Sequence, residues 1–248
     1  MKYIAIIPSR FASSRFPGKA LALVKGTPMI QRVYQQVAKT ESLDGVFVAT
    51  DDIRIAKVIE ESGGDVIMTS AEHTSGTSRC NEAKDILLAG DYLGIDDIII
   101  NVQGDEPFID PQQVQQVMLA FQNKDVNIAT LVKEIDSGDE LFDVNVVKAV
   151  VDRHNKALIF SRQPFPAIRG EARENWINHH TYLKHIGLYA YRVKTLGEIA
   201  NLERSALDEA ESLEQLSWIE NGYDVHAQLT GIDSIGVDVP DDLLKFDP

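Results

Sequence analysis

The first half of the chain alternates short apolar runs, rich in β-branched residues, with segments whose apolar residues recur at helical spacing. The apolar runs are 3–7, 46–50, 66–68 and 97–102. Runs with several consecutive apolar residues, rather than one at every second position, are typical of parallel strands covered on both faces. The alternation therefore predicts βαβ units, and with them an α/β fold whose mostly parallel central sheet is flanked by helices.

Helix start and stop signals lie between these runs. Thr27-Pro28 and Asp110-Pro111 each join a capping residue to a proline suited to the first helical turn, and Asp52 is a further candidate cap. Gly63-Gly64 predicts the end of the helix that Asp52 begins, because glycine adopts left-handed backbone without strain.

The pattern changes after about Asn123. Strand-like segments then lie at 126–132, 146–151 and 185–191, with an irregular stretch at 164–182. The segment 207–218 predicts a long helix, followed by a final strand pair and a turn at 237–240. Since no repeat or linker divides the chain, we expect one domain, 1–248, with a smaller α+β lobe late in the sequence.

Charge and cysteine content exclude several classes of function. The chain has 24 Lys and Arg against 38 Asp and Glu, a formal net charge of −14 at pH 7. Such a surface repels nucleic-acid backbones and anionic membranes, so we expect neither as a partner. The start of the chain, 1–8, predicts a buried strand rather than a signal peptide. The single cysteine, Cys80, cannot form an internal disulfide, and it predicts a cytoplasmic location where thiols stay reduced.

A basic loop follows the first predicted strand. The twelve residues 8–19 hold three cations, three hydroxyls and a glycine in an otherwise acidic protein. Doubly wound sheets bind ligands at the carboxyl ends of their strands, and Arg and Lys side chains suit a polyphosphate. The loop is not a Walker A motif, because Ala20 follows Lys19 where a hydroxyl residue would hold the metal. The alternative is an ordinary solvated loop.

The segment Arg10–Lys19 resembles the signature R-[FY]-x-S-[ST]-R-x-P-G-K of sugar nucleotidyltransferases, and more closely that of the 3-deoxy-manno-octulosonate (Kdo) cytidylyltransferases. Six further blocks agree with this family in order: 48–51, 73–79, 101–107, 160–162 with 185–189, 213–216 and 236–240. The resemblance extends from about Ile4 to Asp242. Agreement of seven blocks in one order makes an accidental likeness improbable.

The resemblance implies a Rossmann-like nucleotidyltransferase fold, with a nucleotide-binding half, 1–123, and a sugar-binding and dimerisation half, 124–248. It implies an enzyme that activates Kdo with CTP, giving CMP-Kdo and pyrophosphate for lipopolysaccharide biosynthesis, and that acts as a homodimer. One alternative keeps the chemistry and changes the sugar acid to 8-amino-Kdo or sialic acid. The other is a nucleotide-binding module without catalysis.

Asp105 is the strongest candidate metal ligand. It follows the run 97–102, so its carboxylate should project from the carboxyl end of a strand, and hard oxygen ligands of this kind suit Mg²⁺. The alternative is a residue that shapes the turn before Glu106-Pro107. The second magnesium ligand, Asp238, comes from the resemblance alone. The resemblance also makes Arg10 and Lys19 catalytic together with these two aspartates, because they would screen the triphosphate.

The remaining site residues are likewise implied by the resemblance. The nucleotide-binding residues are Arg10, Ser13, Arg15, Lys19, Ser75, Gly76 and Arg79. The sugar-binding residues are Gln103, Arg162, His185, Glu214 and Gln215, with Arg162 pairing the sugar carboxylate. Each has a structural alternative: helix capping by Ser75 or Thr77, for example, or a structural hydrogen bond for His185. The other histidines of the second half, 154, 179, 180 and 226, show no zinc-ligand spacing. Ser217 stands where the family commonly has arginine.

Overall fold

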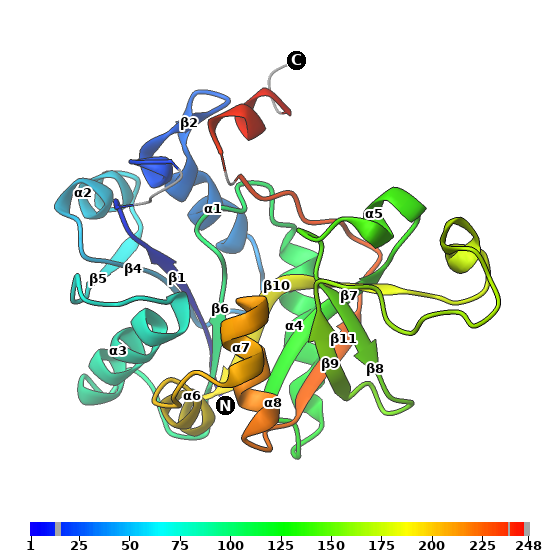
Figure 1. The fold of residues 1–248 in the computed structure, drawn as a ribbon. Helices are drawn as coiled ribbons and strands as arrows, with labels where there is room; N and C mark the ends of the chain where they lie inside the picture. Colours follow the sequence, from blue (N-terminus) through cyan, green and yellow to red (C-terminus); the bar gives the residue numbers. More distant parts are fainter. Residues whose placement is uncertain (13–15, 238, 246–248) are drawn as a thin grey trace. The chain divides into compact units, whose positions relative to one another are not determined.

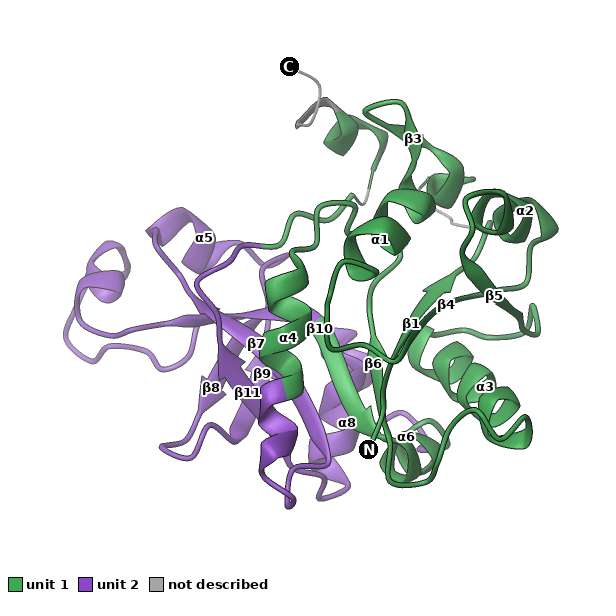
Figure 2. Ribbon diagram, turned by 180° about the vertical axis from the view of Figure 1, so that it is seen from behind, with its two compact units in different colours: residues 1–118, 188–201, 234–248 green, residues 119–187, 202–233 purple. Residues whose placement is uncertain are grey.

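The computed structural model describes residues 1–12, 16–237 and 239–245 (Figure 1). Two compact units are distinguished by their internal contacts (Figure 2). The first comprises Met1–Met118, Leu188–Asn201 and Ser234–Pro248, and the second comprises Leu119–Gly187 and Leu202–Asp233. The expectation of a single domain with halves 1–123 and 124–248 stays a prediction.

The first unit is built on parallel strands. These are β1 (Tyr3–Ser9), β4 (Gly45–Thr50), β5 (Asp65–Met68) and β6 (Ile98–Asn101), hydrogen-bonded in the order β6-β1-β4-β5. The end of β10 (Leu183–Arg192) runs antiparallel to β6, with Tyr189 opposite Asn101. The central strand β1 is fully buried from Ile4 to Ile7. The predicted, mostly parallel sheet is thus confirmed.

Helices cover both faces of this sheet (Figure 1). They are α1 (Met29–Val37), α2 (Ile53–Glu61), α3 (Gly76–Ala89), α4 (Pro111–Leu119) and α6 (Val193–Ile199). Helix α1 packs beside α2, and α3 packs beside α6. Shorter elements complete the unit: 3₁₀ turns η1 (Lys19–Leu21) and η4 (Pro240–Lys245) and a hairpin of β2 (Leu23–Val24) and β3 (Thr27–Pro28). Because β1 and β6 are adjacent, their carboxyl ends meet at one edge of the sheet.

The second unit is α+β, as the sequence predicts. Its strands are β7 (Ile128–Glu134), β8 (Lys148–Val151), β9 (Ala157–Ser161), β11 (Val225–Leu229) and the start of β10. Strand β11 runs parallel to β7, whereas β8 runs antiparallel to both β9 and β10. Its helical segments are α5 (Gly138–Phe142), α7 (Ala206–Glu211), α8 (Glu214–Glu220), η2 (Ala120–Gln122) and η3 (Arg173–Asn178). The segment η3 interrupts the stretch expected to be irregular.

Two of the three predicted helix caps are confirmed. The Asp52 carboxylate accepts a hydrogen bond from the Arg54 amide at 2.9 Å, and α2 ends just before Gly63, whose φ is +81°. The Asp110 carboxylate accepts from the Gln112 amide at 2.8 Å at the start of α4. The expected cap at Thr27-Pro28 is wrong, because these residues form β3 and α1 begins after Pro28 with no side-chain cap.

The long helix expected over 207–218 is also wrong, since α7 and α8 are separate. Ser212 between them has left-handed backbone, φ +53°, which ends the first helix. A buried hydroxyl stabilises the break: Ser217 Oγ accepts from the Ser205 amide at 2.9 Å and donates to Asp208 Oδ2 at 3.0 Å. After α8, β11 stands in place of the expected strand pair within the described residues.

In the described ranges, none of the helices has the length and apolar character that crossing a membrane requires.

Candidate functional site

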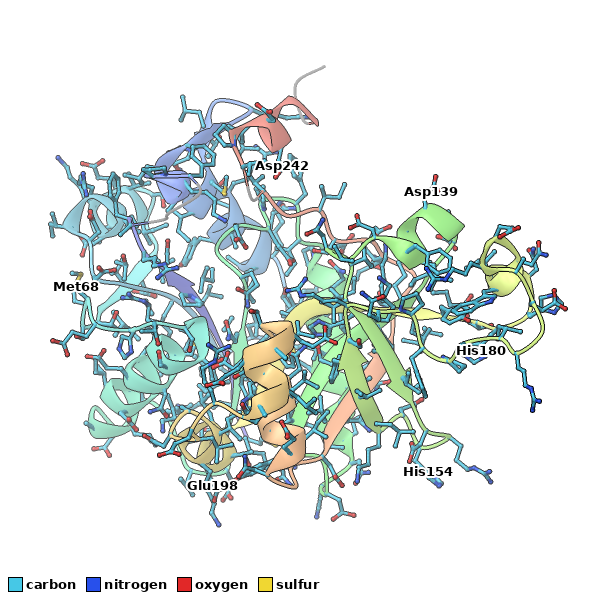
Figure 3. All side chains as sticks on the ribbon, viewed as in Figure 1. Met68, Asp139, His154, His180, Glu198 and Asp242 are labelled. Carbon is cyan, nitrogen blue, oxygen red and sulfur yellow. The ribbon has the colours of Figure 1, made fainter. Side chains whose placement is uncertain are left out.

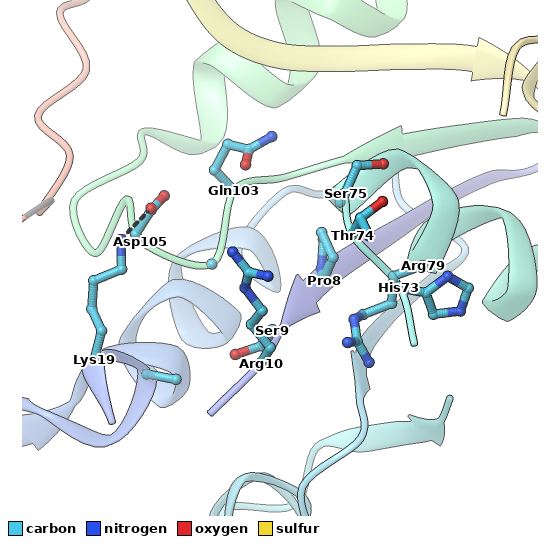
Figure 4. Close-up of a pocket in the computed structure, with 13 residues that line it drawn as sticks. Pro8, Ser9, Arg10, Lys19, His73, Thr74, Ser75, Arg79, Gln103 and Asp105 are labelled. Atoms are coloured by element: carbon cyan, nitrogen blue, oxygen red, sulfur yellow. Dashed lines mark hydrogen bonds and ion pairs between the residues drawn. The ribbon is translucent and has the colours of Figure 1, made fainter. Parts of the chain in front are cut away.

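A pocket of about 260 Å³ opens in the first unit where β1, β6 and the first turn of α3 meet (Figure 4). Its lining comes from four segments of the sequence: Pro8, Ser9 and Arg10; Lys19 and Ala20; His73, Thr74, Ser75, Gly76 and Arg79; and Gln103, Gly104 and Asp105. Seven predicted site residues therefore lie together. Ser13 and Arg15 fall outside the described residues, so their roles stay predictions.

The basic loop is closed at its base by the backbone. The Gly18 amide donates to the Phe11 carbonyl at 3.1 Å, and Gly18 has a φ of +73°, a conformation that glycine adopts without strain. This closure places Arg10 and Lys19 at the two ends of one short loop. Both cations line the pocket.

Lys19 is the link between this loop and the turn after β6. Its ammonium nitrogen lies 2.6 Å from Asp105 Oδ2 and donates to the Val237 carbonyl at 2.9 Å (Figure 4). The Asp105 side chain is 34% exposed, so water and ligand atoms can reach the pair. An ammonium group has three donors and no fixed plane, so Lys19 can turn from a carboxylate to a phosphate without reorganising the backbone.

Gly104 permits the close approach that brings Asp105 to the pocket. A Cβ atom at this position would lie 2.9 Å from the Pro8 carbonyl oxygen, which is closer than such atoms approach. Only glycine therefore lets the turn 103–105 rest against the end of β1. The Val237 amide donates to the Asp105 carbonyl at 2.9 Å, so the late chain passes this turn one residue before Asp238. Asp238 itself lies outside the described residues.

The donor set at the pocket suits a hard cation that keeps phosphate ligands. Among the lining residues, Asp105 supplies the carboxylate, and Gln103 also lines the pocket with a side chain that carries an amide oxygen. No group of three or more His, Cys, Asp and Glu side chains within the described ranges could by itself enclose a metal ion. Magnesium sites commonly have one or two carboxylates and complete their shell with phosphate oxygens and water. Asp105 fits such a site, which remains a prediction.

Glu106, next to Asp105, is a buried acid that sequence reasoning did not assign. Burial raises its pKa to about 7, the nearby Ser234 hydroxyl opposes this shift, and the charge of Asp105 adds to it. Only 9% of the residue is exposed. The sequence shows that Glu106 is adjacent to a predicted metal ligand, but it does not show that Glu106 is buried.

The first turn of α3 begins at the pocket, which Ser75 and Gly76 line. Ser75 caps the helix, since its hydroxyl accepts from the Ser78 amide at 3.1 Å, whereas Thr77, the other candidate cap, is buried inside the first turn. A Cβ on Gly76 would lie 3.3 Å from Pro8 Cγ, so the helix starts tightly against β1. A helix N-terminus carries a partial positive charge and unpaired N–H groups, which suits anionic or polar ligand atoms.

Arg79 lines the pocket and also links α3 to the loops that follow two strands. Its guanidinium donates to Thr69 Oγ1 at 2.6 Å and lies 3.1 Å from Asp51 Oδ1, and only 3% of the residue is exposed. These contacts tie α3 to the ends of β4 and β5. Its predicted nucleotide contact is untested.

His73 lines the pocket. It belongs to the block 73–79 that resembles the family, but it was not among the predicted nucleotide-binding residues. Its Nδ1 lies 3.2 Å from Ser78 Oγ, and its Nε2 is hydrogen-bonded to the Glu82 carboxylate. Glu82 also accepts from the Ser70 amide at 2.9 Å. Glu82 therefore fixes both the ring and the loop that carries it. A usable signal was the spacing of Ser78 and Glu82, one helical turn apart on α3.

Four of the five predicted sugar-binding residues belong to the second unit, and the fifth, Gln103, belongs to the first. Arg162 follows β9 and donates from Nε to the Glu211 carbonyl at 2.7 Å and from Nη1 to the Val144 carbonyl at 3.0 Å. Glu214 and Gln215 open α8, which packs against β9, and Gln215 is buried. Arg162 bonds the last residue of α7, and α7 and β9 both pack against α8, so these predicted residues lie on adjoining elements of one unit.

His185 lies on β10 among uncharged groups. Its Nε2 is 2.9 Å from Thr130 Oγ1, and its ring meets Phe160 edge to face at 5.1 Å between centroids. Burial lowers the pKa of His185 to about 3, so the ring is neutral at physiological pH. A neutral imidazole suits hydrogen bonding to a hydroxyl better than pairing with a carboxylate. By contrast, His154 and His180 are exposed and project outward from this unit (Figure 3).

Comparisons with known proteins agree with this architecture. A family model described as Cytidylyltransferase matches residues 4–227. The 3-deoxy-manno-octulosonate cytidylyltransferase of Parabacteroides distasonis is 51% identical over 249 residues, covering 99% of this chain and 96% of the relative. That of Bacteroides thetaiotaomicron is 48% identical, covering 98% and 96%.

Solved structures agree as well. The structure of CMP:2-keto-3-deoxy-manno-octonic acid synthetase complexed with CTP matches with a TM-score of 0.88 and 37% identity, over 99% of this chain and 96% of that chain. The 4-diphosphocytidyl-2C-methyl-D-erythritol synthase of Anaerococcus prevotii matches with a TM-score of 0.59 and 13% identity, over 99% and 96%, a likeness of fold alone. The two relatives that are 51% and 48% identical therefore carry the same activity in their names, and the CTP-bound synthetase shares the fold.

Proposed function

Because the chain belongs to the 3-deoxy-manno-octulosonate cytidylyltransferase family, we propose that it transfers CMP from CTP to Kdo, giving CMP-Kdo and pyrophosphate. The observation that carries this proposal is the pocket that joins Arg10 and Lys19 to Asp105 and to the first turn of α3. The solved relative at TM-score 0.88 holds CTP, which supports the same nucleotide here. Lipopolysaccharide biosynthesis is the process that consumes such a product in this family.

The reaction is a direct displacement in which the anomeric hydroxyl of Kdo attacks the α-phosphorus of CTP. The new bond joins this oxygen to the α-phosphorus, and the hydroxyl proton passes to bulk water. The bond between the α-phosphorus and the bridging oxygen breaks, and pyrophosphate leaves with its electron pair. No covalent enzyme intermediate is required. Transfer of this kind depends on alignment and on neutralising charge, which are the properties that the pocket supplies.

Each segment of the pocket has a role in this proposal. Arg10 and Lys19 neutralise the triphosphate, with Arg15 and Ser13 assigned to the same loop, and Ser75, Gly76 and Arg79 orient the nucleoside from the start of α3. Before CTP binds, the Lys19 ammonium group is paired with the Asp105 carboxylate.

Asp105 and Asp238 would hold Mg²⁺, which when bound draws the phosphate oxygens together and offsets their charge. The hydrogen bond between Val237 and Asp105 supports this assignment, because it brings the chain beside Asp238 to the Asp105 turn.

The sugar acid is assigned to Gln103, Arg162, His185, Glu214 and Gln215. Arg162 is the partner for its carboxylate, and the two carbonyl contacts of that guanidinium use two of its five N–H donors. The neutral ring of His185 is suited to a sugar hydroxyl. A further proposal follows from the resemblance: the enzyme acts as a homodimer. The buried Cys80, which forms no disulfide, supports a reducing, cytoplasmic location.

Measuring pyrophosphate release tests the activity. With Mg²⁺ present, we expect release only when CTP and Kdo are supplied together, and much slower release when UTP replaces CTP. A higher kcat/KM with 8-amino-Kdo or sialic acid would assign the enzyme to that sugar acid instead. Binding of CTP without any release of pyrophosphate would identify a nucleotide-binding module and overturn the proposal.

The metal assignment needs its own variants. Asp105→Asn and Asp238→Asn should each lower kcat by about a hundredfold or more while the fold remains intact, because each removes a ligand charge from the transition state. The matched control is Asp125→Asn, which changes an exposed aspartate in the second unit. Near-normal turnover in both pocket variants would remove magnesium from these aspartates.

A further inference from the structure

Phe11, in the basic loop, is held by an arginine from a different part of the sequence. The guanidinium carbon of Arg54 lies 3.4 Å from the centroid of the Phe11 ring. Arg54 is the second residue of α2 and does not line the pocket. A guanidinium stacked on an aromatic face is attracted by the negative charge density of the ring and fixes its position.

The arginine is itself fixed at the end of β4. Its Nε donates to Asp52 Oδ1 at 2.9 Å and its Nη2 to Asp52 Oδ2 at 2.5 Å, a two-bond fork. These bonds hold the pKa of Asp52 below its ordinary value, so the pair stays ionised at neutral pH. The Asp52 amide donates in turn to Thr50 Oγ1 at 3.2 Å, and Thr50 is the buried last residue of β4.

Helix capping alone does not require this arrangement. The cap of α2 needs only the bond from the Arg54 amide to Asp52, which any residue other than proline could make at position 54. The side-chain fork and the stack on Phe11 are additional, and they hold the partly exposed guanidinium against the loop. This favours a role in the loop over a role in the helix.

Phe11 also lies against the glycine that closes the loop. A Cβ on Gly18 would lie 3.2 Å from Phe11 Cζ and 3.3 Å from Cε2, so the ring rests against the Gly18 backbone. Phe11 follows Arg10 and Gly18 precedes Lys19. The position of one ring therefore sets where both pocket cations leave the backbone.

We propose that Asp52, Arg54, Phe11 and Gly18 form a clamp that presents Arg10 and Lys19 to the triphosphate, so that Arg54 and Phe11 are positioning residues for the nucleotide. The inference rests on the proposed function, because it concerns the binding of CTP. It assigns the clamp to the phosphates and not to the base. Loss of the clamp should therefore weaken CTP more than CMP, which has a single phosphate.

Calorimetric titration of the full chain with CTP and with CMP tests the clamp. Arg54→Lys keeps the charge and loses the planar fork, while Phe11→Leu keeps an apolar side chain and loses the ring. Each should raise the Kd of CTP by roughly 3- to 30-fold and that of CMP by less than about twofold. The double variant should bind CTP no more weakly than the weaker single variant, because both changes break one contact.

Two controls keep the result specific. Lys57→Ala removes an exposed cation from the same helix without touching the loop and should bind CTP as the wild type does. Phe11→Tyr keeps the ring and should retain the wild-type ratio of CMP to CTP affinity. Arg54 has a 56% exposed side chain, so its substitution should leave the melting temperature within about 3 °C of wild type.

The outcomes separate the clamp from the proposed function. If the wild type does not bind CTP, the proposed function fails. The clamp is refuted if the wild type binds CTP and the two clamp variants bind it as tightly as the wild type does. It is also refuted if the variants lose affinity for CTP and for CMP in the same proportion. Additive losses in the double variant would also refute it.

Discussion

Gly104→Ala is the substitution whose effect the structure defines most closely. The new Cβ would lie 2.9 Å from the Pro8 carbonyl oxygen, about 0.5 Å inside the 3.4 Å at which ordinary contact begins. Pro8 is part of β1, whose backbone is paired on both sides with β4 and β6, so the turn 103–105 has to move instead. Overpacking of this kind costs about 1–3 kcal/mol of folding free energy.

The same movement displaces Asp105 and Gln103. A misplacement of about 1 Å at a reacting centre costs roughly a hundredfold in rate, so a shift of about half that size should cost about tenfold in kcat/KM. Gly138→Ala is the matched control, because nothing lies within 4 Å of a Cβ at that position. Urea unfolding and pyrophosphate release should be measured for both variants. A Gly104→Ala enzyme with stability within 0.5 kcal/mol and activity within twofold of wild type would refute the argument from close approach.

Three further substitutions test separate parts of the account. The pKa of His185 is about 3 in the folded chain and 6.5 in the unfolded chain, so between pH 7.5 and 5.5 only the unfolded chain binds this proton. Over that range the wild type should lose about 1.4 kcal/mol of folding free energy that His185→Asn does not lose. Equal pH dependence of the two proteins in urea unfolding would contradict the pKa. Ser75→Ala removes the acceptor for the Ser78 amide and should cost about 1 kcal/mol of stability together with weaker CTP binding, and an unchanged Kd would show that the first turn of α3 does not contact the ligand. Glu82→Gln should raise the KM for CTP severalfold with little change in kcat, because it loosens His73 and its loop, and a fall in kcat alone would point to a different role.

The sheet and the caps could be predicted because the information is local. Consecutive apolar residues such as those at 98–100 specify a strand covered on both faces, and Asp52 specifies a helix start through a bond two residues away. The break between α7 and α8 is not local in this sense. Helical spacing continues through Ser212, and the break depends on the bonds that Ser217 makes with residues before it.

The site divides in the same way. Residues at strand ends, such as Arg10 and Asp105, could be expected to share an edge of the sheet, and the structure brings them to one pocket. The contact of Arg54 with Phe11 joins separate segments and left no pattern in the sequence. Asp238 could be assigned only by resemblance, because nothing in its spacing from Asp105 points to a shared ion.

A crystal structure of the chain with CTP and Mg²⁺ tests the central claim most directly. The account predicts the triphosphate between Lys19 and the first turn of α3, with one cation that touches both the Asp105 and the Asp238 carboxylates and a phosphate oxygen. A nucleotide bound outside this pocket, or those two carboxylates lying too far apart to share one ion, would contradict it.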